Sequence, residues 1–328
     1  MYIDGYAGRG QYESGSDGSS GRMLEFAAGQ RFGQSGRQID LFLCEKDPES
    51  FTHLEELAST YRRKGIIAET RNGRAEDFLP EAIQHAEGLP AFIYLDPCGV
   101  SVPFEQVVQC LNRTDRSWPP TELLLNFSIE AVRRIGGHIA SENGSVKTIA
   151  TLDRALGGTW WHNYFEHGVT TESVNSVVAE YMKRLGARTN CHVVSIPVHR
   201  RPGRKPIYHL VFATRHGGGV WNFADKAARA IEAWWRRAAE VDGGLDLYPH
   251  IEDIETGAVA TIAENIAQIL SERGQFKLGD HAFDVFGNYY GLVRETTARK
   301  AVQLLYKERR ISSNGVGVKK IENIVIDP

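Results

Sequence analysis

The amino-acid sequence predicts an α/β fold with a mostly parallel sheet, followed by a small C-terminal domain of helices and a short β-wing. Over the first two-thirds of the 328 residues, short β-branched or aromatic runs alternate with amphipathic stretches. This alternation is typical of β-α-β units, in which helices cover both faces of a parallel sheet. Near residue 250 the pattern changes to helices separated by polar turns, which predicts a second domain.

Four predicted helices connect five predicted strands in the parallel part of the sheet. The strands are expected at Tyr2–Asp4, Ile39–Glu45, Ile66–Thr70, Ala91–Asp96 and Glu122–Asn126. The helices are expected near Ser20–Phe32, Glu49–Lys64, Glu76–Glu87 and Pro103–Asn112. Connections of about a dozen residues or more are what neighbouring parallel strands require.

An insertion interrupts this alternation between about residues 128 and 170. A helix near Ser173–Leu185 and two extended runs, Cys191–Val198 and Ile207–Thr214, follow it. The Pro202-Gly203 pair between the two runs predicts an antiparallel hairpin. A sheet with this ending resembles the Rossmann-like sheet of a class I methyltransferase, whereas nicotinamide-binding domains end differently.

The boundary between the two domains is expected shortly after a closing helix over Trp221–Ala239. Gly243-Gly244 and Pro249 interrupt the helical pattern there. We therefore expect a methyltransferase-like domain over residues 1–248 and a second domain over residues 249–328.

The second domain has the pattern of a winged helix. Ala258–Arg273 and Arg294–Arg310 have helical periodicity. A polar, Gly-containing turn over Ile311–Gly317 and an alternating strand over Val318–Ile326 follow, and they predict the wing.

Composition sets further bounds on function. The formal net charge of −3 argues against a uniformly basic nucleic-acid binder but allows local basic patches. No apolar run approaches the roughly 20 residues of a membrane-spanning helix, and the N-terminus lacks a signal-peptide pattern, which together predict a cytoplasmic protein. The four cysteines are scattered without zinc-ligand spacing, so reduced, mostly structural thiols and no metal site are expected.

The glycine-rich segment after the first strand is the strongest functional signal. Asp4 leads into Tyr6-Ala7-Gly8, and Gly10 follows two residues later. Glycines at these positions let the backbone approach a ligand and adopt positive φ. The next helix N-terminus favours negative charge, such as the methionine carboxylate of S-adenosyl-L-methionine. The alternative is a plain turn.

An acidic residue, Glu45, ends the second predicted strand, and Asp47 stands just beyond it. A carboxylate at this place can accept hydrogen bonds from both ribose hydroxyls of a nucleotide cofactor. The alternative is a carboxylate that caps the following helix.

The fourth predicted strand delivers Asp96-Pro97 to the carboxyl edge of the sheet, where open α/β sheets bind ligands. This pair fits the first half of the D/N-P-P-Y/F loop of amino-methyltransferases, in which the acid and the proline carbonyl hold the target amino group. Cys98-Gly99 does not fit the second half. Cys98 could instead act as a nucleophile, as in cytosine C5-methylation. A tight turn after a buried strand is the third interpretation.

Taken in order, these segments resemble the three-Cys-motif partner protein family over roughly residues 2–240. The matching segments are Tyr2 to Gly10, Gly18-Ser19-Ser20, Glu45, Leu95-Asp96-Pro97 with Gly99, and Leu124 to Phe127. The tail resembles the winged-helix domain often attached to that family. Relatives are bacterial or phage-borne, have a Rossmann-like methyltransferase fold, and are encoded beside a radical-SAM-like three-Cys-motif protein.

The resemblance implies cofactor contacts at Asp4, Gly8, Gly10 and Glu45 and a reaction-side loop at Asp96, Pro97 and Gly99. Three positions depart from the family pattern. Arg9 replaces a proline, Cys98 replaces an aromatic residue, and Arg74 replaces the acid that commonly meets the adenine amino group. Glu76 or Asp77 is a candidate substitute for that acid. The chain also begins at the first strand without the usual preceding helix, so a truncated N-terminus is expected.

Two basic clusters are candidate nucleic-acid contacts. One lies on the predicted hairpin turn, with Arg200, Arg201, Arg204 and Lys205; the alternative is a solvated loop. The other lies on the second helix and wing of the tail, with Arg299, Lys300 and Lys319, although winged helices also bind proteins. Trp160 and Trp161 could stack on a base, but such a pair more often belongs to a core or covers a cleft.

The leading hypothesis is an S-adenosyl-L-methionine-dependent methyltransferase that acts on an amino group in nucleic acid, in a mobile-element or defence locus. The alternative is a catalytically degenerate partner protein that binds DNA or a neighbouring radical-SAM-like protein. A dehydrogenase is a third hypothesis, which the Asp96-Pro97 loop and the terminal hairpin disfavour.

Overall fold

The structure is a computed structural model that describes residues 1–113, 118–201, 204–241 and 251–328. It divides into two compact units. The first consists of residues 1–197 and 207–215, and the second of residues 198–206 and 216–328. The Pro202-Gly203 pair and the predicted domain boundary at 248/249, with Gly243-Gly244 and Pro249, lie outside the described residues.

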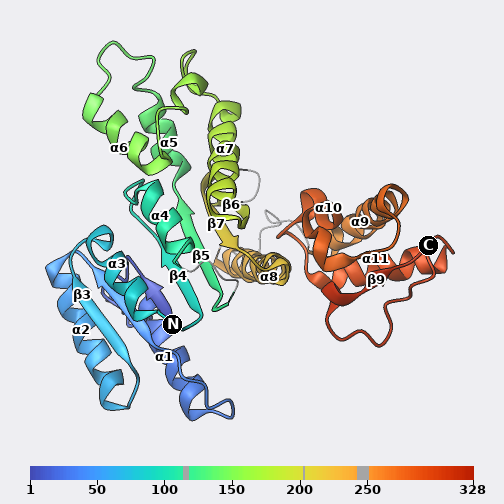
Figure 1. Cartoon of the computed structure of the whole chain (residues 1–328), viewed down its shortest axis with the longest axis horizontal. Coiled ribbons are helices and arrows are strands. Elements are labelled where there is room, and N and C mark those ends of the chain that lie inside the picture. The colour runs from blue at the N-terminus through green and yellow to red at the C-terminus, as the bar shows by residue number, and fades with distance from the viewer. Residues whose placement is uncertain (114–117, 202–203, 242–250) are drawn as a thin grey trace. The chain divides into compact units, whose positions relative to one another are not determined.

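A seven-stranded sheet forms the centre of the first unit (Figure 1). Its first five strands have the doubly wound order of a Rossmann-like sheet, and the sheet continues with two further strands. In spatial order these are β3 (Ala68–Asn72), β2 (Leu41–Glu45), β1 (Tyr2–Asp4), β4 (Ala91–Leu95), β5 (Thr121–Phe127), β7 (Pro206–Thr214) and β6 (His192–His199).

Strand direction confirms the predicted sheet. β1 pairs in parallel with both β2 and β4, and β4 pairs in parallel with β5. Only the pairing of β5 with β7 is antiparallel among these, with Leu124 opposite Phe212. The strand order and this ending define a Rossmann-like sheet of the class I methyltransferase type. β3 begins and ends two residues later than expected, so its last residue is Asn72.

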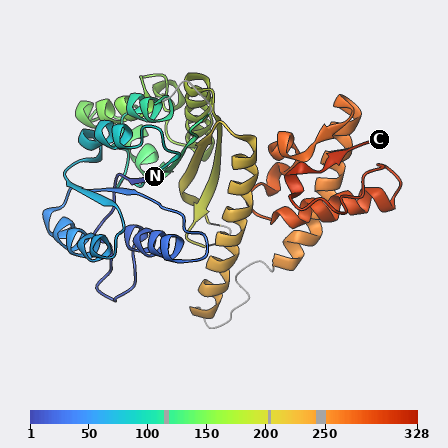
Figure 2. The same cartoon turned by 60° about the horizontal axis from the view of Figure 1, so that its bottom comes forward.

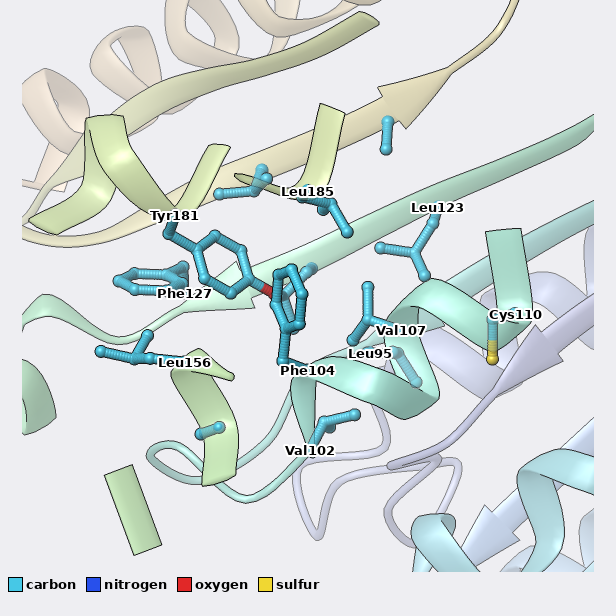
Figure 3. Packing of buried hydrophobic residues seen from close by; sticks show 14 of the residues in the cluster. Leu95, Val102, Phe104, Val107, Cys110, Leu123, Phe127, Leu156, Tyr181 and Leu185 are labelled. Atoms are coloured by element: carbon cyan, nitrogen blue, oxygen red, sulfur yellow. The ribbon is translucent and has the colours of Figure 1, made fainter. Parts of the chain in front are cut away.

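Helices pack on both faces of the sheet because alternate strand residues point to opposite sides. Tyr2, Leu41 and Leu43 pack against α1 (Ser19–Phe32) and α2 (Pro48–Arg63). Ile3, Phe42 and Ile93 face the larger cluster on the other side. Figure 2 shows helices on both sides of the sheet. That cluster includes residues of α3 (Ala75–His85), α4 (Phe104–Leu111) and α7 (Thr171–Thr189). Figure 3 shows Phe104, Phe127 and Tyr181 packed together in it.

The predicted insertion forms α5 (Ile129–Gly136), α6 (Val146–Leu156) and the 3-10 turn η1 (His162–Tyr164). Trp161 is fully buried there, and its indole N–H donates to Asp153 at 2.9 Å. The guanidinium of Arg184 lies 4.7 Å from the ring centre of Trp160. The core interpretation of this tryptophan pair therefore fits Trp161, which has no exposed face on which a base could stack.

The described residues of the second unit include three longer helices. These are α8 (Gly217–Val241), α9 (Ile251–Arg273) and α11 (Glu295–Lys307). Shorter elements lie between α9 and α11 and after α11: β8 (Phe276–Lys277), η2 (Leu278–His281), α10 (Ala282–Phe286), η3 (Gly287–Tyr289), η4 (Ile321–Asn323) and β9 (Val325–Ile326).

Helix α8 belongs to this second unit, whereas the sequence placed it with the sheet. Polar side chains on α8 explain the difference. The Trp221 indole donates to Glu295 at 2.9 Å, and Arg294 donates to Glu232 at 2.8 Å. Asp225 accepts the backbone N–H of Glu295 at 3.2 Å. A hydrophobicity pattern does not reveal such polar contacts between distant segments.

The prediction of a strand over Val318–Ile326 is wrong. Only Val325–Ile326 is extended, and it pairs with Phe276–Lys277 in a two-stranded antiparallel sheet. Ile321 and Ile324 are both buried, and their spacing of three suits the 3-10 turn that forms there. The expected wing over residues 311–326 is thus a loop and a turn for most of its length.

Candidate active site

The loop after β1 is fixed from below by Asp4, which is fully buried. Its Oδ1 accepts the backbone N–H of Tyr6 at 3.0 Å, and its Oδ2 accepts the hydroxyls of Tyr2 at 3.1 Å and Ser19 at 3.3 Å. Burial raises the pKa of Asp4 to about 6, although these three donors act to lower it. Asp4 therefore shapes the loop from beneath it rather than facing a ligand directly.

The two loop glycines have different surroundings. Gly8 has φ +62°, and a Cβ built there would meet no atom within 4 Å. Gly10 has φ +81°, and its Cβ would lie 2.7 Å from a methyl of Leu57 in α2. Gly8 therefore leaves open space for a ligand, whereas Gly10 allows close packing between the loop and a helix.

The start of α1 holds the loop instead of facing the cleft. The Ser20 hydroxyl donates to the carbonyl of Ala7 at 2.6 Å, and the N–H of Ala7 donates to the carbonyl of Cys44 at 2.8 Å. Ala7 is buried by these contacts. The expected anion site at this helix N-terminus is not part of the cleft lining within the described residues.

Glu45 ends β2 next to this loop. Its Oε2 accepts the N–H of Gly8 at 2.9 Å, and its Oε1 accepts the N–H of Asp47 at 2.8 Å. Asp47 is the N-cap of α2 and accepts the N–H of Ser50 at 2.8 Å, which lowers the pKa of Asp47. The capping interpretation thus applies to Asp47, and the carboxylate of Glu45 remains at the edge of the loop.

A cleft of about 450 Å³ opens between the ends of β1, β2 and β4. Of the predicted site residues, Tyr6, Gly8, Glu45 and Asp96 line it together. Asp4, Ala7, Gly10, Asp47 and Asp77 do not. The complete lining is Gly5, Tyr6, Gly8, Glu45, Lys46, Arg74, Ala75, Glu76, Asp96, Cys98 and Ser101.

An arginine–glutamate pair forms the wall of the cleft at the start of α3. Arg74 Nη2 lies 3.1 Å from Glu76 Oε1, and the Glu76 side chain is 11% exposed. The pairing raises the pKa of Arg74. Gln106 donates to the carbonyl of Glu76 at 2.7 Å and fixes its backbone. Of the two acids considered for adenine, Glu76 lines the cleft and Asp77 does not.

Asp96 follows β4 and is held by two side chains that the sequence did not single out as site residues. Tyr94 donates its hydroxyl to Asp96 Oδ2 at 3.1 Å, and Asn126 donates its amide N–H to Asp96 Oδ1 at 2.6 Å. Burial and the nearby Asp96 both raise the pKa of Tyr94. These bonds fix the carboxylate and leave further lone pairs on each oxygen.

The rest of the Asp96 loop faces two directions. Cys98 is exposed and lines the cleft. Pro97 and Gly99 line a separate cavity of about 20 Å³, backed by Leu156 and Tyr181. Pro97 and Gly99 therefore shape the loop from behind, and the thiol of Cys98 stands nearer to a ligand in the cleft.

Several of the predicted basic contacts are used within the protein. The Arg299 guanidinium donates to the carbonyls of Gly315 and Val318, and Lys300 pairs with Glu255 at 2.9 Å. His199 contacts the carbonyl of Arg204 on the hairpin. Arg200, Arg204, Lys205 and Lys319 are exposed.

Two negative findings concern the described residues as a whole. Among them, no cluster of three or more His, Cys, Asp or Glu side chains has the arrangement of a metal site. Within the same residues, every helix is too short or too polar to cross a membrane.

No protein-family model and no curated protein matches this sequence. Among solved structures, the small RNA methyltransferase HEN1 aligns with a TM-score of 0.36 and 10% identity. That alignment covers 66% of this chain and 24% of the HEN1 chain, so this protein spans about a quarter of that length. The methyltransferase domain of bacterial CtHen1 aligns with a TM-score of 0.34 and 9% identity over 65% of this chain and 89% of that one.

Proposed function

We propose that this chain is an S-adenosyl-L-methionine-dependent methyltransferase that acts on an amino group in nucleic acid. The observation that carries the proposal is the shared cleft, with the Gly8 loop and Glu45 on one side and Asp96 on the other. Its volume of about 450 Å³ falls within the range of small-molecule sites. Polar groups from three neighbouring strand ends converge on it, as expected for ligand binding in an open α/β sheet.

The residues fit the proposed cofactor in three places. Each oxygen of Glu45 accepts one backbone N–H and keeps a lone pair for a ribose hydroxyl. Glu76, held by Arg74, offers an acceptor for the adenine amino group. The open space at Gly8, together with Gly5 and Tyr6 in the cleft lining, would receive the methionine part. The bound cofactor would supply an electrophilic methyl group.

Asp96 would act by positioning the acceptor. A target amino group that donates an N–H to this carboxylate has its nitrogen lone pair directed away from Asp96, toward the centre of the cleft. Because Tyr94 and Asn126 fix both oxygens, little orientational freedom remains to be lost when the substrate binds. After methyl transfer, the methylated nitrogen would release its extra proton to water.

The nucleic-acid part of the proposal is supported by exposed cations. Arg200, Arg204 and Lys205 lie together near the β6–β7 turn. We further propose that the second unit is a winged helix, since α9, β8, α10, α11 and β9 follow one another in a helix-strand-helix-helix-strand order. By family resemblance, a radical-SAM-like three-Cys-motif protein is the proposed protein partner.

A catalytically degenerate partner protein is the second candidate function. Cys98 favours it, because an exposed thiol lines the cleft where amino-methyltransferases of the D/N-P-P-Y/F type carry a second proline. Arg74 does not favour it specifically, because Glu76 beside it would offer an acceptor in place of the missing acid.

Calorimetry with S-adenosyl-L-methionine tests the cofactor site. Glu45→Gln and Glu76→Gln should each weaken binding by about 1–3 kcal/mol, because each removes a charged hydrogen-bond acceptor. Asp77→Asn is the matched control, since Asp77 is adjacent to Glu76 but outside the cleft lining, and it should bind as the wild type does. If the wild-type protein binds no cofactor, the proposal that it is an enzyme is rejected. Binding without transfer of labelled methyl to DNA, RNA or protein would favour the second candidate.

A further inference from the structure

The C-terminal end of α11 carries a surface pocket in the second unit that the function proposed above does not use. Its volume is about 450 Å³. Tyr306 is 47% exposed, and Lys307, Arg309 and Ser312 are exposed around it. The pocket is lined by Tyr306, Lys307, Arg309, Ile311, Ser312 and Pro328.

The backbone at Arg309 is unusual. Helix α11 ends in a Schellman motif, in which the N–H of Arg310 donates to Leu305 at 2.9 Å and that of Arg309 donates to Tyr306 at 3.0 Å. Arg309 takes the left-handed position with φ +59°, which glycine occupies at least cost. Among the described residues, the other non-glycine residue with a left-handed backbone is an asparagine, Asn190, a residue type that tolerates this conformation. Carrying an arginine at this position costs stability, which points to a use for its side chain.

The cations of this region fall into two groups. Arg299 donates to two loop carbonyls, Lys300 pairs with Glu255, and Arg310 pairs with Glu264 at 2.6 Å. Lys307 and Arg309 have no ion-pair partner among the described residues, and both line the pocket. On α11 and its C-terminal end, the two cations available to an outside anion therefore lie together at this pocket.

We propose that this pocket binds one nucleotide of a single-stranded nucleic acid. Lys307 and Arg309 would contact the phosphate, the hydroxyl of Ser312 would add a hydrogen bond, and the Tyr306 ring would stack on the base. An exposed aromatic ring beside two unpaired cations suits an unpaired base, whereas bases in a duplex stack on one another. The cations nearer the start of α11, which a duplex groove would need, are occupied.

This inference rests on the nucleic-acid part of the proposed function and not on its cofactor site. Fluorescence anisotropy of the full chain with labelled single-stranded oligo(dT) and oligo(rU) tests it. Lys307→Gln and Arg309→Gly should each weaken binding about fivefold to tenfold and lower the salt-dependence slope by about 0.7. Tyr306→Ala should weaken it at least about fivefold through lost stacking. Lys300→Gln, a matched cation on the same helix, should leave the affinity unchanged.

Arg309→Gly separates binding from folding. Glycine relieves the left-handed backbone, so the unfolding temperature should rise by a few degrees while oligonucleotide binding falls. The proposal is overturned if neither single strand binds, if a duplex of equal length binds as tightly, or if Lys300→Gln loses as much affinity as Lys307→Gln. Arg309 does not line the cleft, so Arg309→Gly should bind S-adenosyl-L-methionine as the wild type does in calorimetry. A protein that binds no cofactor would count against the cleft proposal and not against this pocket, so the two proposals stay distinct.

Discussion

The same pattern, Tyr-x-Asp, stands at the carboxyl ends of two adjacent strands, completing β1 and running one residue past β4, yet the two carboxylates have different surroundings. In β1, Tyr2 donates its hydroxyl to Asp4, and in β4, Tyr94 donates to Asp96, both at 3.1 Å. Asp4 is fully buried under the loop that follows it. Asp96 lines the cleft. The same local device therefore serves a structural role in one strand and a candidate catalytic role in its neighbour.

The register of the two strands explains the difference. Tyr2 lies opposite Phe92, and Asp4 lies opposite Tyr94, so the pattern in β4 extends two residues further toward the carboxyl edge. At that edge β1 turns into the glycine loop, which closes over Asp4 through the N–H of Tyr6. Asp96 lies beyond this closure and receives its second donor from Asn126 on β5. A shift of two residues thus separates a carboxylate that shapes the loop from one that lines the cleft.

The strongest way to break the comparison is to remove the side-chain acceptor of Asp96. Asp96→Ala should lower methyl transfer by about 100-fold to 1000-fold, because the target amino group loses the acceptor that aligns it. Cofactor affinity, measured by calorimetry, should stay at the wild-type value, and the unfolding free energy should change little. Asp96→Asn is the matched variant: the D/N-P-P-Y/F pattern allows asparagine at this position, so it should keep more transfer than Asp96→Ala. Transfer that persists in Asp96→Ala would remove Asp96 from the site.

Neutralising Asp4 should instead change how stability depends on pH. Burial raises the pKa of Asp4 from 3.8 to about 6, so between these values the folded state binds more protons than the unfolded state. Its contribution to stability is therefore full below the lower value and is lost as pH rises through the higher one. At about 1.4 kcal/mol per unit, this loss amounts to about 3 kcal/mol.

Urea unfolding at several pH values between 3.5 and about 7.5 checks this sign. Other carboxylates also titrate in this range, so the informative quantity is the difference between wild type and Asp4→Asn. The unfolding free energy of the wild type minus that of Asp4→Asn should decrease as pH rises. Parallel curves for the two proteins would show that Asp4 has the same pKa in the folded and unfolded states.

Much of the fold was predictable because it depends on local patterns. The limits of β1 were predicted as observed, and the alternation of strands and helices identified the parallel sheet. The wrong strand prediction over 318–326 also comes from reading a local pattern. Hydrophobicity alone is compatible with Ile321 and Ile324 in a strand or in a 3-10 turn. Their burial in the same turn appears only once the surrounding helices are packed.

The candidate site was predictable only in part. Glu45 and Asp96 end their predicted strands, so sequence alone indicated the edge on which they lie. Asn126 could not be assigned to Asp96, because the contact depends on how β4 and β5 are aligned. The pairing of Lys300 with Glu255, 45 residues away, was hidden for the same reason. Contacts between distant segments follow from register and packing, which composition does not specify.

A finer test of the comparison removes only the tyrosine hydroxyls. Tyr94→Phe deletes one of the two donors to Asp96, so transfer should fall about fivefold while cofactor affinity and stability stay near wild type. Tyr2→Phe deletes a donor to the buried Asp4, so stability at neutral pH should fall by about 1–2 kcal/mol while transfer is largely kept. Because the Tyr2 hydroxyl lowers the pKa of Asp4, its loss should also move the pH-dependent change in stability to higher pH. Equal effects of the two variants on transfer would mean that both carboxylates act on the substrate through the same loop, and the distinction between them would fail.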